Sequence, residues 1–79
     1  MNVEHPLADD VTEVANHVLN FFSQGGYSGG SFTLALLDAM GRADPTNLRR
    51  IGLGFPVQVG CYMLAMEGDF EYLRKLGGT

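Results

Sequence analysis

The chain has 79 residues and a formal net charge of −4, which predicts one small acidic domain. Its single cysteine excludes an intrachain disulfide, and no cysteine–histidine group has the spacing of a zinc site. The acidic balance disfavours nucleic acids and anionic membranes as partners, and the uncharged runs are too short or too rich in glycine to span a bilayer.

Residues 1–9 are polar, contain a proline and predict a flexible lead-in. Acidic residues stand where a signal peptide would carry its cationic region, so we expect a cytoplasmic protein. Asp9 or Asp10 is then placed to cap a helix over residues 10–23. Apolar residues recur there at i, i+3 and i+4, while Asn16 and its polar neighbours face the other way. This pattern predicts an amphipathic helix with one face in water.

Residues 23–30 contain four glycines and predict a flexible loop. A phosphate-binding loop is the functional alternative, but no strand precedes it and the lysine of a P-loop is absent. We therefore interpret the segment as a connector, with Tyr27 turned inward. Ser31 is expected to cap the next helix, SFTLALLDAM, which should end at Gly41.

Two further helices are predicted from their boundaries. In Asp44-Pro45 a carboxylate that can cap a helix precedes a proline, and proline suits the first turn of a helix. The pair therefore predicts a helix over 45–53. Near the end of the chain, Asp69 should cap a helix over 70–76. Two basic residues lie in its last turn, where the helix dipole favours positive charge.

The stretch 56–66 has no charged residue and carries two apolar stripes at helical spacing. The first stripe consists of Val57, Cys61, Leu64 and Ala65, and the second of Val59, Tyr62, Met63 and Met66. A helix that is apolar on both sides requires cover on both sides. We therefore expect an all-α single domain over 1–79, with about five short helices packed around a buried helix 56–66.

Short segments between Gly29 and Ala65 carry a resemblance. They are Gly30-Ser31-Phe32-Thr33, Ala43-Asp44 followed by Asn47, and Leu53-Gly54-Phe55-Pro56 followed by Val59. In these segments the chain resembles small all-helical proteins of actinobacterial phages, of the mycobacteriophage type. The matching residues mark structural boundaries, so no catalytic residue carries over. The resemblance implies a phage accessory protein that binds a host protein in the bacterial cytoplasm, with inhibition of host growth as one outcome.

Two residues are candidates for catalysis or metal binding. His17 lies one helical turn after Glu13, where imidazole and carboxylate can converge on a metal ion, but a third ligand is missing. Cys61 could act as a nucleophile with His17 as its base. It falls on an apolar stripe, however, where burial raises the pKa of a thiol and lowers its reactivity. We therefore expect no enzyme, metal or other cofactor, and a cysteine- or metal-dependent hydrolase is the most distant alternative.

Arg42, Arg49 and Arg50 form the densest positive charge. The helices before and after Gly41 faintly resemble a helix-turn-helix. Its reading helix would carry Thr46, Asn47, Arg49 and Arg50. The acidic balance opposes this, and the predicted turn is longer than the motif requires. A small DNA-binding regulator is therefore the first alternative function. Otherwise the arginines should pair with carboxylates on neighbouring helices, namely Asp38, Glu67 or Glu71.

The second stripe of helix 56–66 is the predicted interface. Aromatic residues and methionine are enriched at protein interfaces, although an ordinary core would use the same residues. Five short helices can hardly cover two full stripes, so we predict a contact through Val59, Tyr62, Met63 and Met66. The predicted function is a non-enzymatic protein-binding module that acts on a host protein and associates with itself as a dimer.

Overall fold

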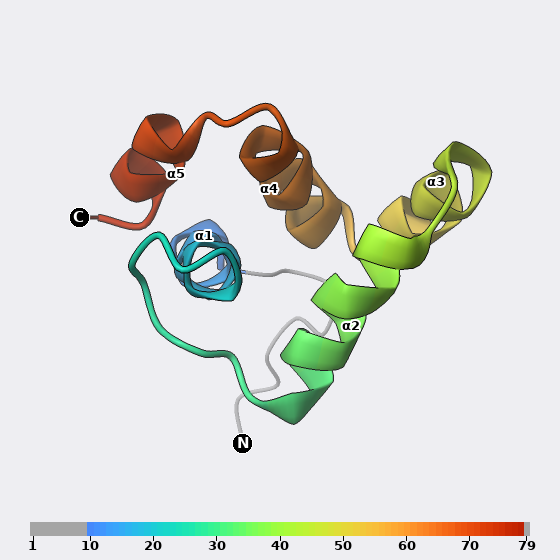
Figure 1. Cartoon of the computed structure of the whole chain (residues 1–79), viewed down its shortest axis with the longest axis horizontal. Coiled ribbons are helices and arrows are strands. Elements are labelled where there is room, and N and C mark those ends of the chain that lie inside the picture. The colour runs from blue at the N-terminus through green and yellow to red at the C-terminus, as the bar shows by residue number, and fades with distance from the viewer. Residues whose placement is uncertain (1–9, 79) are drawn as a thin grey trace, which may run out of the picture.

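The computed structural model describes residues 10–78, which form five successive α-helices (Figure 1). They are α1 (Val11–Phe21), α2 (Ser31–Arg42), α3 (Pro45–Gly54), α4 (Pro56–Met66) and α5 (Phe70–Leu76). No strand occurs in this part of the chain, so the predicted all-α domain of about five helices is confirmed. The predicted lead-in, 1–9, lies outside the described residues. Within 10–78, no helix combines the length and the apolar character needed to cross a membrane.

Three aspartates begin three of the helices, as predicted. One side-chain oxygen of Asp10, Asp44 and Asp69 accepts a hydrogen bond from a backbone N–H two or three residues later, at 2.9, 2.7 and 3.2 Å respectively. These bonds satisfy donors that the first helical turn leaves without partners. The aspartate caps fix where α1, α3 and α5 start. Pro45 and Pro56 occupy the first positions of α3 and α4 and fix the start of those two helices.

The boundaries of α2 differ from the prediction at both ends. Gly30 is the N-cap with φ +92°, a conformation suited to glycine, and Ser31 is the first helical residue rather than the cap. Gly41 lies inside the helix, which continues to Arg42. The helix ends because Ala43 is extended and leads into the proline of α3, whose predecessor must also avoid the helical conformation.

Helix α1 carries more buried residues than any other described helix. Figure 1 shows it end-on, with α2, α4 and α5 around it, and it packs against all three. Its apolar face lies in the core, with α2 and α5 contributing further buried side chains. The fully buried residues of these three helices include Ala15, Val18, Leu19, Leu37, Met40 and Leu73.

The polar face predicted for α1 is only partly in water. Asn16 is buried, and its Nδ2 donates hydrogen bonds to the carbonyl oxygens of Thr12 at 2.9 Å and Gly77 at 3.0 Å. The connector to α2 also returns to this residue, because the Tyr27 N–H donates to its carbonyl oxygen at 3.2 Å. A side chain at Gly26 would collide with that same oxygen. The prediction that Asn16 faces water is therefore wrong, because two distant segments fold over it.

Helix α4 packs against each of the other four helices, as expected for a helix around which the domain is organised. Its core side presents Cys61, Tyr62 and Ala65, all buried. The other side is not covered, since Met63 and Met66 are 43% and 59% exposed. The second stripe is therefore divided, since Tyr62 is buried whereas Met63 and Met66 are exposed. Four short helices cover only part of the circumference of α4.

Candidate functional site

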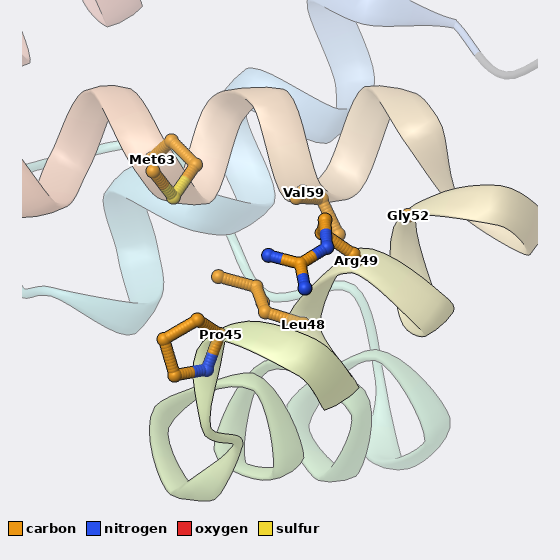
Figure 2. A pocket seen from close by; sticks show the side chains of 6 residues that line it. All are labelled: Pro45, Leu48, Arg49, Gly52, Val59 and Met63. Atoms are coloured by element: carbon orange, nitrogen blue, oxygen red, sulfur yellow. The ribbon is translucent and has the colours of Figure 1, made fainter.

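An apolar groove of about 260 Å³ lies between α3 and α4 (Figure 2). The two helices are consecutive and meet at Phe55, so the wall from each is placed by one short connection. The side chains and backbone around the groove are largely apolar. The groove is lined by Pro45, Leu48, Arg49 and Gly52 from α3 and by Val59 and Met63 from α4.

Helices α3 and α4 come close together at Gly52. A Cβ built on Gly52 would lie 3.7 Å from both γ carbons of Val59, so the backbone of α3 comes close to this side chain. Near their junction, α3 and α4 are therefore in contact. Farther from it, Pro45 and Met63 stand apart on opposite walls, and the groove opens between them (Figure 2).

Arg49 provides a positive charge at the edge of this apolar space. Its side chain lies among the lining residues in Figure 2 and is exposed. Its Nη2 donates a long hydrogen bond of 3.5 Å to the hydroxyl of Thr46. Among the described residues, no carboxylate lies within ion-pair distance of Arg49. The apolar lining can therefore contact an apolar side chain, and Arg49 can pair with a carboxylate.

The structure separates the four residues of the predicted interface. Tyr62 is 6% exposed and packs near Phe22, with the two ring centroids 5.9 Å apart. It belongs to the core and cannot reach a partner from the folded chain, so its place in the interface is corrected. Val59 and Met63 line the groove, and Met66 is exposed on the same helix. The interface prediction now applies to these three residues.

The predicted charged patch does not act as a unit. Arg42 Nε pairs with Asp38 Oδ2 at 3.0 Å, a predicted partner but on the same helix rather than a neighbouring one. Arg50 Nη1 donates to Asn47 Oδ1 at 3.2 Å. Neither Glu67 nor Glu71 forms an ion pair with these arginines in the described part of the chain.

The connection from α2 to α3 has only Ala43 and Asp44 outside the helices, so it is shorter than the helix-turn-helix connection, not longer as predicted. Arg49 alone of the three arginines lines the groove.

Cys61 and His17 lie on different helices. Cys61 is buried, and burial raises the pKa of its thiol. His17 is half-buried and packs edge-on against Tyr27, with ring centroids 5.5 Å apart. No hydrogen bond joins the cysteine to the histidine, and no three or more His, Cys, Asp or Glu side chains cluster to hold a metal ion, within residues 10–78.

The α3 wall of the groove was not predicted from the sequence. From the sequence, Arg49 was assigned to a charged patch and Leu48 to no site. One signal was available, because Pro45, Leu48 and Gly52 recur at i, i+3 and i+7 and so share one side of a helix. The sequence did not indicate that this side would face α4.

Comparisons with protein-family models, with curated proteins and with solved structures found no match to this chain. The resemblance to phage proteins therefore stays a prediction. Any function assigned to the groove rests on the chemistry of the residues that line it, chiefly Arg49, Val59 and Met63.

Proposed function

We propose that the protein is a non-enzymatic binding module that holds part of another protein chain in the groove between α3 and α4. The observation that carries the proposal is the groove itself, an apolar space of about 260 Å³ with a positive charge at its edge. When an apolar side chain enters the groove, its surface and that of the lining residues are removed from contact with water, and this burial favours association. The flexible thioether of Met63 can adapt its shape to the side chain that enters.

The charge at the edge specifies the chemistry of the partner. A carboxylate next to the inserted apolar side chain would meet the guanidinium of Arg49, and charge-assisted hydrogen bonds of this kind are strong and directional. A basic segment would instead be repelled. The partner segment should therefore combine an exposed Leu, Met or Phe with a nearby Asp or Glu.

The resemblance to actinobacterial phage proteins supports a bacterial host protein as the target and the host cytoplasm as the place of action. Occupation of a functional surface on that protein would inhibit host growth. The net charge of −4 supports a protein partner over a nucleic acid, because binding to phosphates draws on a surplus of positive charge.

A photo-crosslinking experiment tests the proposal. The photoreactive residue p-benzoylphenylalanine replaces Met63 in one sample and Tyr72, on α5, in a control, since the two side chains are similarly exposed at 43% and 49%. In an actinobacterial lysate containing the added protein, we expect a discrete crosslinked protein at position 63. This product should disappear when the photoreactive chain also carries the substitution Arg49→Glu. Equal labelling at both positions, or none at position 63, would exclude the groove as a binding site.

A further inference from the structure

We propose that one segment that fits the groove is α4 of a second copy of this chain, so that two copies pair with their α4 helices antiparallel. This inference rests on the proposed function, because it names an occupant for the same groove. The symmetric arrangement is self-complementary, and a two-fold axis is the commonest way for identical chains to close an interface.

The exposed side of α4 has the chemistry that the groove requires. Pro56, Gly60, Met63 and Glu67 are all exposed, and they recur at intervals of four, three and four residues. Residues at this spacing form one line along a helix. The line therefore presents an apolar side chain, Met63, one helical turn before a carboxylate, that of Glu67. That is the pair expected of a partner for the apolar groove and Arg49.

Antiparallel pairing about Met63 places complementary residues opposite one another. If Met63 faces the partner's Met63, residues three positions away pair in reverse order, so Gly60 faces the partner's Met66. Gly60 is exposed, and a Cβ built on it would meet no atom within 4 Å. The open position at Gly60 leaves space for the long, flexible side chain of the partner's Met66, which is 59% exposed in the single chain.

The same register brings opposite charges together. Val59 then faces the partner's Glu67, and Arg49 lines the groove on the side of Val59 (Figure 2). Neither Arg49 nor Glu67 forms an ion pair within the described part of a single chain. Symmetry gives two such pairs, one at each end of the interface. Ion pairs at the edge of an interface fix its register and exclude wrong partners more than they add affinity.

The overall charge makes these two pairs informative. Each chain carries a net charge of −4, so two copies repel one another at long range. Association through a featureless apolar patch would not relieve that repulsion. Pairing Arg49 with the partner's Glu67 places the positive charge of each groove against a negative charge of the other chain, and thus favours this one orientation.

A charge-reversal cycle measured by sedimentation equilibrium tests the inference. Arg49→Glu and Glu67→Arg should each weaken dimerisation by about tenfold, because each places like charges opposite one another, and the double variant should return to within about threefold of wild type. The matched controls are Arg50→Glu and Glu71→Arg, the same changes at exposed residues that do not line the groove. These controls should leave the dimer affinity close to that of wild type.

Three outcomes would overturn the inference: a wild type that stays monomeric at millimolar concentration, single variants no weaker than their controls, or a double variant that does not recover. The crosslinking result separates this failure from failure of the proposed function. If position 63 crosslinks only to a different protein, the groove binds protein but its occupant is not a second copy. If position 63 crosslinks to nothing, both proposals fail.

Discussion

Asn16 is the buried polar residue that connects the two ends of the described chain. Its amide group donates one hydrogen bond within α1 and one, of 3.0 Å, to the carbonyl oxygen of Gly77. The side chain also packs closely on Gly77, where an added Cβ would lie 3.1 Å from Nδ2. A neighbouring contact supports the same closure, because Arg74 donates to the backbone and side-chain oxygens of Gln24 at 3.3 and 3.0 Å.

Replacing Asn16 by Ala should therefore lower the free energy of unfolding by about 1–3 kcal/mol, since the buried Gly77 carbonyl loses its partner. Asn20→Ala, on the exposed side of the same helix, should change it by no more than about 0.5 kcal/mol. Urea unfolding of the three proteins measures both effects. Equal losses for the two variants would show that the contact between Asn16 and Gly77 contributes nothing.

Cys61 gives the chain a pH dependence of known sign. Burial raises the pKa of its thiol, so the folded state holds this proton to a higher pH than the unfolded state does. The resulting stabilisation is complete below about pH 8.5, the ordinary thiol pKa, and is lost as the pH rises towards the raised folded-state value.

Wild type should therefore lose stability more steeply than Cys61→Ala between about pH 8 and 10, which urea unfolding at several pH values measures. The alanine variant is less stable at neutral pH, because it leaves a small cavity, and the difference should narrow as the pH rises. A difference that stays constant over this range would mean that the thiol is accessible to water.

At the scale of elements, most boundaries could be predicted because they depend on neighbours in the chain. The caps at Asp10, Asp44 and Asp69, and the prolines after Asp44 and Phe55, act within one turn of helix. The side of a helix that is covered depends on the other helices instead. That dependence explains why the sequence did not show which residues of the second stripe of α4 belong to the core, and why Asn16 on α1 was expected to face water.

Leu19 on α1 and Met63 on α4 test this assignment of the core. Leu19 is fully buried, so Leu19→Ala should cost about 2–5 kcal/mol of stability, whereas Met63→Ala should cost less than about 1 kcal/mol. Thermal melts followed by circular dichroism rank the two variants. If Met63→Ala is as damaging as Leu19→Ala, the exposed side of α4 belongs to a core in solution.

For the whole molecule, the fold leaves α3 at the edge. Figure 1 shows α3 and α5 at opposite ends of the view, and α3 has no fully buried residue and packs mainly on α4. The α4 half of the groove, Val59 and Met63, was predicted from the apolar stripe. The α3 half was not, because its residues become neighbours of α4 only when the two helices fold back on one another.

The central proposal is that a second copy of this chain binds at the exposed side of α4 and the groove beside it. Proton–nitrogen correlation spectra of the wild-type protein across a concentration series test it most directly. We expect concentration-dependent shifts at the amides of residues 59–67 and 48–52, with those of α5 unchanged. Spectra that do not change with concentration, or shifts centred on α5, would contradict the claim.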